Sequence, residues 1–179
     1  MNKIIALVGM CGAGKSVVCK MFTDAGWSDV YFGGVTMDRL AELGLEKNEK
    51  NERQVRESLR REYGPAAFAI MLEPKIASKI EESNVVLDGL YSWSEYKRLK
   101  ETFGDRMKVL AVMTDRAVRY KRLHDRPVRP LTDEEAKSRD YSEIENLEKG
   151  GPISIADYYV LNNGELEALK ERVNEIIAE

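Results

Sequence analysis

Hydrophobic and polar positions follow two alternating patterns along the chain. Short, continuous apolar runs rich in β-branched residues are typical of strands buried on both faces of a parallel sheet. Longer stretches that repeat an apolar residue every three or four positions are typical of helices. The short runs predict strands at 4–8, 30–32, 85–87, 108–113 and 158–161, with helical stretches between them. The alternation predicts an α/β fold with a mostly parallel sheet, formed by a single domain over 1–179.

The stretch of about fifty residues between the second and third strands looks helical. Within it, Asn51–Tyr63 is highly charged and carries only a thin apolar stripe of Val55, Leu59 and Tyr63. A helix with so narrow a stripe buries little, so this part is interpreted as a lobe that moves. Pro74 is expected to kink or break the helix that follows.

Two capping boxes mark helix starts later in the chain, at Ser92-x-x-Glu95 and Thr132-x-x-Glu135. The second predicted helix runs to about 147 and is expected to end at Gly150-Gly151-Pro152. Apolar side chains at helical spacing after the first box and in the last helix are expected to be core: Trp93, Tyr96, Leu99, Phe103, Leu166, Leu169, Val173, Ile176 and Ile177.

Composition and charge narrow the class of protein. The chain has 179 residues, of which 43% are hydrophobic, and a formal net charge of −3. This balance does not predict binding to nucleic acid or to an anionic membrane. No segment approaches the ~18 consecutive apolar residues of a membrane span, and no signal peptide is recognisable. A cytoplasmic protein is therefore expected, and the oligomeric state stays open.

A glycine-rich loop follows the first predicted strand. It reads G-x-x-x-x-G-K-S from Gly9 to Ser16, the pattern of a phosphate-binding P-loop between a strand and a helix. Successive backbone N–H groups in such a loop bind anions, Lys15 is expected to reach the β- and γ-phosphates, and Ser16 to ligate Mg²⁺. The residues expected around the ATP phosphates are Gly9, Cys11, Gly12, Ala13, Gly14, Lys15, Ser16 and Val17.

The two cysteines, Cys11 and Cys19, lie eight positions apart around this loop. On one helix axis that spacing corresponds to ~12 Å, which is too long for a disulfide. Cys11 is either a reactive thiol, activated by Lys15 and the helix N-terminus, or the occupant of an unconstrained loop position. The second interpretation is favoured.

A carboxylate ends the third predicted strand, at Asp88-Gly89. In P-loop proteins such an aspartate holds Mg²⁺ directly or through water, so Ser16 and Asp88 form the expected metal site. The residue after Asp88 is glycine rather than an acid that would activate water, which disfavours a dedicated hydrolase. The guanine-reading N-K-x-D pattern is absent from the sequence.

Arginines are dense in the stretch from Thr114 to Arg126. Arg119, Arg122 and Arg126 are spaced by three and four, so they share one helix face, and Arg129 follows between two prolines. Guanidinium groups stabilise the charge of a transferring phosphoryl group. The alternative is a solvated basic face. His124, the only histidine, is expected to be a solvated residue near these arginines.

Together these residues resemble the P-loop nucleotide kinases, the adenylate-kinase-like and dephospho-CoA-kinase-like enzymes. The likeness extends along nearly the whole chain. It includes an adenylate-kinase-related group, many of whose members are archaeal. Their sequences share G-M-x-G-x-G-K-S, a D-G pair after the third strand, and A-D-Y near the end. The resemblance implies a P-loop three-layer sandwich with a five-stranded parallel sheet in the order 2-3-1-4-5.

The resemblance also implies roles for individual residues. Asp88-Gly89 matches the L-D-G of adenylate kinases, Arg39 matches an arginine that contacts the acceptor phosphate, and Arg122 and Arg126 match arginines at the base of the lid. The segment 156–164 is similar to A-D-x-V-I-x-N-x-G of dephospho-CoA kinases, which lies near the adenine. Its adenine-side residues are Asn162, Asn163 and Gly164.

Two departures concern the acceptor. Ser92 stands where adenylate kinases have the arginine of D-G-F-P-R, which disfavours AMP. Gly33-Gly34 stands near the place of the D-A-D of dephospho-CoA kinases, which disfavours dephospho-CoA.

The interpretation is ATP- and Mg²⁺-dependent phosphoryl transfer to a small nucleotide- or nucleoside-like acceptor. Lys15, Asp88, Arg119, Arg122 and Arg126 are the expected catalytic residues. An acceptor-binding lobe at about 36–82 and a lid at about 126–150 would exclude water. Either Asp38 or Asp88 would orient the acceptor hydroxyl. The alternative is a regulator that hydrolyses ATP slowly, or a degenerate kinase.

Overall fold

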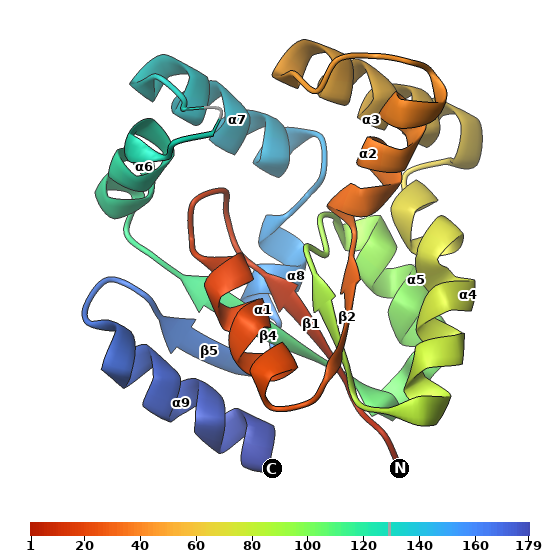
Figure 1. Cartoon of the computed structure of the whole chain (residues 1–179), viewed down its shortest axis with the longest axis vertical. Coiled ribbons are helices and arrows are strands. Elements are labelled where there is room, and N and C mark those ends of the chain that lie inside the picture. The colour runs from red at the N-terminus through yellow and green to blue at the C-terminus, as the bar shows by residue number, and fades with distance from the viewer. Residues whose placement is uncertain (129) are drawn as a thin grey trace.

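A parallel sheet forms the centre of the molecule (Figure 1). The structure is a computed structural model that describes residues 1–128 and 130–179. The strands pair in parallel in the order β2-β3-β1-β4-β5. They are β1 Ile4–Val8, β2 Ser28–Tyr31, β3 Val85–Asp88, β4 Met107–Met113 and β5 Tyr158–Leu161. The predicted fold and strand order are confirmed, and the second strand begins two residues earlier than predicted.

Helices cover both faces of the sheet (Figure 1). They are α1 Lys15–Asp24, α2 Gly33–Glu42, α3 Glu49–Tyr63, α4 Ala67–Glu82, α5 Trp93–Phe103, the 3-10 turn η1 Gly104–Arg106, α6 Arg116–Asp125, α7 Asp133–Glu145, α8 Gly150–Ser154 and α9 Leu166–Ala178. Among the described residues, none of these helices combines the length and apolar character needed to cross a bilayer.

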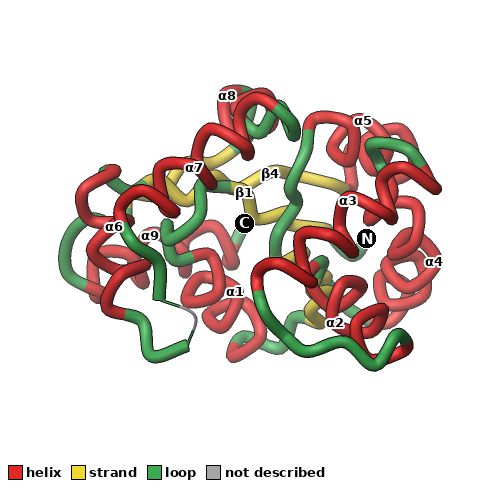
Figure 2. The backbone as a smooth tube through the Cα atoms, turned by 90° about the horizontal axis from the view of Figure 1, so that it is seen from above, coloured by secondary structure: helices red, strands yellow, loops and turns green. Residues whose placement is uncertain are grey.

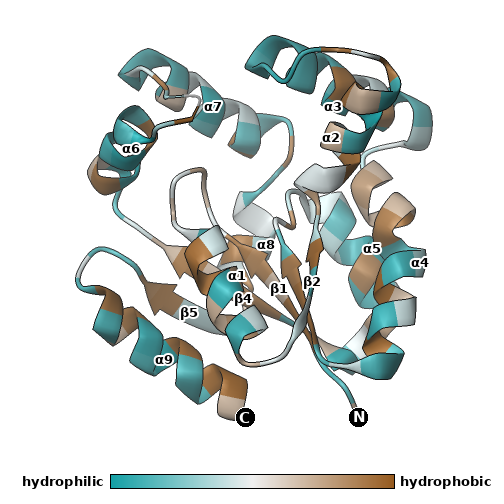
Figure 3. Cartoon of the chain, in the orientation of Figure 1, coloured by the Kyte–Doolittle hydropathy of each residue, from teal (hydrophilic) through white to brown (hydrophobic). Residues whose placement is uncertain are grey.

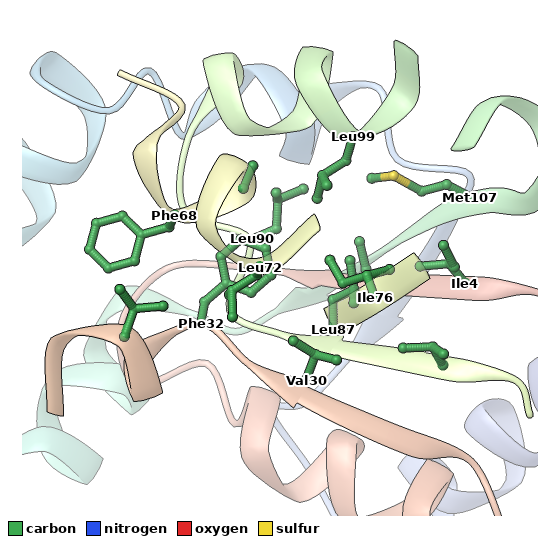
Figure 4. Close-up of a cluster of buried hydrophobic side chains, with 14 of the residues drawn as sticks. Ile4, Val30, Phe32, Phe68, Leu72, Ile76, Leu87, Leu90, Leu99 and Met107 are labelled. Atoms are coloured by element: carbon green, nitrogen blue, oxygen red, sulfur yellow. The ribbon is translucent and has the colours of Figure 1, made fainter. Parts of the chain in front are cut away.

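Alternate side chains of the strands supply two hydrophobic clusters. Ile4 and Val8 of β1 face the cluster that α4 and α5 complete, whereas Ile5 and Leu7 face the cluster under α1 and α9. Figure 4 shows part of the first cluster, and Figure 3 shows the apolar strands against helices with polar outer surfaces. Burial on both faces explains why the strands have continuous apolar sequences rather than alternating ones.

Both capping boxes form as predicted. The Ser92 hydroxyl accepts from Glu95 N–H at 3.1 Å, and the Thr132 hydroxyl accepts from Glu135 N–H at 3.2 Å. In the aromatic stripe after Ser92, Phe103 is buried and Tyr96 packs against the core. In the last helix, Leu169, Val173 and Ile176 of the predicted core face are buried and Ile177 is partly buried, whereas Leu166 is 47% exposed.

Two local predictions were wrong. α4 continues through Pro74, because the buried Leu72 and Ile76 on either side hold the helix against the core. Gly150-Gly151-Pro152 opens the short helix α8 rather than ending a helix, and proline is tolerated there because N–H groups of a first turn have no intrahelical partner. In the thin stripe of α3, Val55 and Leu59 are buried and Tyr63 is exposed, so the helix buries only a narrow face, as predicted.

Two groups of helices extend beyond the carboxyl ends of the strands (Figure 1). α2 and α3 lie on one side, and α6 and α7 lie on the other. The view from above shows the same separation (Figure 2). In open α/β sheets the ligand site lies outside the carboxyl ends of the strands, so the region between these groups is the place to search for one.

Candidate functional site

The P-loop connects β1 to α1 with glycines in conformations that other residues rarely adopt. Gly9, Gly12 and Gly14 have φ of +143°, +81° and +94°. A Cβ on Gly9 would lie 2.5 Å from the Val112 carbonyl oxygen, and one on Gly14 would lie 2.2 Å from Asn162 Nδ2. The glycines are therefore required both by backbone conformation and by close packing.

The inner side of this loop offers hydrogen-bond donors. Among the described residues, no hydrogen bond is made by the backbone N–H groups of Gly12, Gly14, Lys15 and Ser16. Lys15 Nζ donates to the carbonyl oxygens of Gly9 at 2.8 Å and Met10 at 3.2 Å. Burial, assisted by Lys149, lowers the pKa of Lys15 to about 8. Unpaired amides at a helix N-terminus beside a half-buried lysine fit a polyphosphate.

Asp88 and Ser16, the residues of the predicted magnesium site, lie at the end of β3 and in the first turn of α1. Asp88 ends β3 opposite Leu7 of β1, next to the start of the P-loop. Burial raises the pKa of its carboxyl, and the charge of Lys15 opposes that shift. Ser16 lies exposed in the first turn of α1. No cluster of three metal-binding side chains occurs among the described residues. Mg²⁺ is usually held by one or two protein groups together with waters and phosphates, and its binding by Ser16 and Asp88 stays a prediction.

The loop between β5 and α9 packs directly on the P-loop. Asn162 Nδ2 donates to the Ala13 carbonyl at 2.8 Å, and Arg122 Nη2 donates to the Asn162 carbonyl at 2.8 Å. Arg122 Nη1 is buried without a hydrogen-bond partner among the described residues, on the side of Gly14. An unpaired guanidinium nitrogen at a P-loop fits a phosphate oxygen.

The neighbours of Asn162 point elsewhere. Asn163 Oδ1 accepts from the Asp115 N–H at 2.7 Å, which ties this loop to the start of α6. Gly164 is exposed. The contact of this segment with adenine stays a prediction.

Arg119 does not point freely toward the phosphates. Its two terminal nitrogens bind the Asp140 carboxylate at 2.8 and 2.7 Å, and Nη1 also donates to the Cys11 carbonyl at 3.0 Å. The side chains of Arg119 and Asp140 are 6% and 9% exposed. The donors expected to close over a transferring phosphoryl group are thus used to hold the P-loop to α7. Arg126 lines the cavity described next, and Arg129 lies outside the described residues.

A cavity of about 1090 Å³ lies between α3 and α7. α3 contributes Arg56 and Arg60 to its wall, and α7 contributes Arg139 and Glu143. Arg139 Nη1 lies 3.5 Å from a carboxylate oxygen of Glu49, so an ion pair joins the two walls. The cavity therefore belongs jointly to the predicted acceptor-binding lobe and the predicted lid.

Arg60 is a largely buried cation of this cavity with an unused donor. Its side chain is only 18% exposed, and its guanidinium packs 4.9 Å from the Phe68 ring centroid. Arg60 Nε is buried without a partner among the described residues, and so is Glu95 Oε1, which lies 3.9 Å from Arg60 Nη2. Burial lowers the pKa of Arg60. A buried guanidinium with unused donors fits an anionic group of a ligand.

Arg39 and Asp38 lie away from this wall. Arg39 pairs with Glu42 at 2.8 Å and its side chain is 45% exposed. Asp38 is exposed, and neither residue lines the cavity. The Arg39 side chain leaves α2 on its solvent side, and its contact with an acceptor phosphate stays a prediction.

Comparison with protein families gives a direct assignment. Residues 5–148 match the family model described as an AAA domain. A UPF0200 protein of Pyrococcus abyssi is 32% identical over 178 residues, which cover 97% of this chain and 95% of that protein. The chain belongs to the UPF0200 family.

Solved structures similar to this UPF0200 member share its fold. A gluconokinase from Sinorhizobium meliloti matches with a TM-score of 0.66 and 16% identity, covering 99% of this chain and 92% of that one. A dephospho-CoA kinase from Campylobacter jejuni matches with a TM-score of 0.60 and 19% identity, covering 100% and 97%. The predicted membership among P-loop kinase-like proteins is confirmed. At 16% and 19% sequence identity, these two structures show a shared fold and not a shared activity.

Several residues of this UPF0200 site were missed from sequence. Arg60, Arg139, Glu143 and Lys149 lie among charged stretches that resemble solvated helix surfaces. A signal for Arg56 and Arg60 was present in the sequence. They lie four positions apart and flank the apolar stripe of α3, next to the buried Val55 and Leu59, which places them at the edge of the buried helix face. Lys149 gave none, since nothing in a Glu-Lys-Gly-Gly sequence predicts a side chain that is 1% exposed.

Proposed function

We propose that the protein transfers the γ-phosphoryl group of Mg-ATP to a hydroxyl group of a small nucleotide- or nucleoside-like acceptor. One observation carries the proposal. The P-loop and the arginine-lined cavity meet at Glu143, which lines the cavity and accepts a hydrogen bond from the Cys11 N–H of the P-loop at 3.3 Å. A phosphate donor site and an anion-binding cavity are thus contiguous, which in-line transfer requires.

The donor side uses the P-loop. Its free amides and Lys15 would hold the phosphates, and Ser16 and Asp88 would hold Mg²⁺, which supplies charge neutralisation when bound. Arg122 would use its unpaired Nη1 on a phosphate oxygen. Arg119 would act as a positioning residue, because Asp140 and the Cys11 carbonyl already take its donors.

The acceptor side uses the cavity between α3 and α7. Arg60 and Arg139 would bind an anionic group of the acceptor, such as the phosphate of a nucleoside monophosphate, in place of the predicted Arg39. Arg126 would complete this wall near the end of α6.

Two segments would isolate the reaction from water: an acceptor-binding lobe at 36–82 and a lid at 126–150. The Glu49–Arg139 ion pair at 3.5 Å supports their closing on each other. A cytoplasmic location is proposed with this function, and the free thiols of Cys11 and Cys19 agree with a reducing compartment.

The test measures ADP release from Mg-ATP with and without nucleoside monophosphates, nucleosides and dephospho-CoA. Acceptor-dependent release that disappears in Lys15→Ala would support a kinase and identify its substrate class. Arg60→Met should then raise the KM for an anionic acceptor by at least tenfold, because a hydrogen bond to a charged group is lost. Slow release that ignores every acceptor would instead favour the ATP-hydrolysing regulator.

A further inference from the structure

Glu143 occupies a position in the site that the roles proposed above do not explain. Its Oε2 accepts from the Cys11 N–H at 3.3 Å and from Lys149 Nζ at 2.8 Å, and its Oε1 accepts from Arg139 Nε at 3.5 Å. Among the described residues, it is the one carboxylate that both lines the cavity and bonds to the P-loop. It therefore lies at the boundary between the donor and acceptor sides.

The carboxylate is charged, and its charge is balanced. Burial would raise its pKa, but Lys149, Lys15 and Arg139 outweigh burial and hold the pKa at about 2. Lys149 is 1% exposed, and its ammonium also lies 5.4 Å from the Tyr91 ring centroid. A buried lysine dedicated to one carboxylate lets that carboxylate stand near a polyphosphate with reduced repulsion.

Buried hydrogen bonds join the helix of Glu143 to the P-loop. Asp140, one turn earlier on α7, holds Arg119, which donates to the Cys11 carbonyl, while Glu143 accepts from the Cys11 N–H. Residues three apart share one helix face, so α7 binds the Cys11 N–H directly through Glu143 and holds the arginine that binds the Cys11 carbonyl through Asp140. Glu143 is therefore positioned relative to the phosphate site by a buried hydrogen-bonded frame, as a group that acts on a reacting atom must be.

The two aspartates considered for orienting the acceptor are placed less well. Asp38 is exposed and outside the cavity wall. Asp88 lies at the end of β3, beside the charge of Lys15, where the proposed metal site uses it. Glu143 has neither limitation.

We propose that Glu143 orients the acceptor hydroxyl and takes its proton during phosphoryl transfer. This inference rests on the proposed kinase function. As the hydroxyl oxygen bonds to the γ-phosphorus, the bond from that phosphorus to the β–γ bridging oxygen breaks and its electron pair leaves on ADP. The acceptor O–H bond breaks, its proton passes to a carboxylate oxygen of Glu143, and then to solvent. A carboxylate of low basicity suffices, because the hydroxyl becomes acidic only as its oxygen bonds to phosphorus.

The test compares Glu143→Gln with Glu145→Gln, a matched change at an exposed position of the same helix. Two quantities are measured. The first is the turnover of Mg-ATP, with water or with each acceptor of the panel as nucleophile. The second is the Kd with which the protein binds β,γ-imido-ATP in the presence of Mg²⁺. Glu143→Gln should slow turnover by about 100-fold, the usual contribution of a positioned acid–base group. It should bind the triphosphate analogue about fivefold more tightly, because a nearby negative charge is removed. Glu145→Gln should change neither quantity.

The opposite signs of these effects separate a catalytic role from a structural one. Three results would each overturn the inference. The first is slower turnover together with weaker analogue binding in Glu143→Gln, and the second is turnover of Glu143→Gln within threefold of wild type. The third is the same effects in Glu145→Gln. If Glu143→Gln does not fold, Glu143→Gln/Lys149→Met removes the unpaired buried ammonium as well, and its turnover must still fall by about 100-fold. If the wild-type protein binds the analogue but shows no ATP turnover with water or with any acceptor of the panel, the proposed function itself is wrong.

Discussion

The Arg119–Asp140 pair offers a test of how firmly α7 is attached to the P-loop. Asp140 accepts three hydrogen bonds, from Arg119 at 2.8 and 2.7 Å and from the Tyr120 hydroxyl at 3.2 Å. Asp140→Asn removes the charge and leaves the Arg119 guanidinium, whose side chain is 6% exposed, without its counter-ion. Breaking a buried pair on one side costs about 3–5 kcal/mol, a large part of the roughly 5–15 kcal/mol that stabilises a domain.

The assay is urea unfolding followed by circular dichroism, with thermal melting alongside. For a chain of this length the loss corresponds to a Tm lower by roughly 6–20 °C. Arg119→Met/Asp140→Leu should recover much of the loss, because apolar groups of similar size replace the whole pair. A loss below about 1 kcal/mol in Asp140→Asn, the value of an exposed ion pair, would refute the reasoning. It would mean that the pair opens to solvent and that α7 is not fixed to the P-loop.

Three further outcomes are expected. Lys15→Ala should abolish nucleotide turnover with an unchanged circular dichroism spectrum, and wild-type turnover would remove the P-loop assignment. Gly14→Ala should lower the unfolding free energy by about 1–3 kcal/mol and weaken ATP binding, since φ is +94° and the new Cβ would lie 2.2 Å from Asn162 Nδ2. The control is Gly26→Ala, with φ of +89° but nothing within 4 Å of its Cβ; an equal loss there would show that the close contact has no effect. Burial raises the pKa of Glu95 to about 7. The folded state therefore holds a proton that the unfolded state releases near pH 4.5, so stability falls as the pH rises from 4.5 to 7, by roughly 3 kcal/mol in total. Glu95→Gln should remove this slope in urea titrations across pH 5–8, and parallel curves for the two proteins would contradict the shifted pKa.

The sequence by itself determined the features that depend on neighbouring residues. The continuous apolar runs predicted the strands of a parallel sheet, because both faces of each strand are covered. The P-loop and the two capping boxes were recognised because their hydrogen bonds join residues a few positions apart. The strand order came from the family resemblance, since periodicity carries no information about which strands are adjacent.

The tertiary structure decided which charged side chains face the site. Glu143 reaches the Cys11 N–H across 132 positions, and Arg119 meets Asp140 across 21. Arg60 faces the cavity while Arg39 faces solvent, although both lie in charged helical sequence. α4 continues through Pro74, and the flanking Leu72 and Ile76 are buried in the core. In each case the outcome depends on long-range packing, which chooses among side chains that local sequence leaves equivalent.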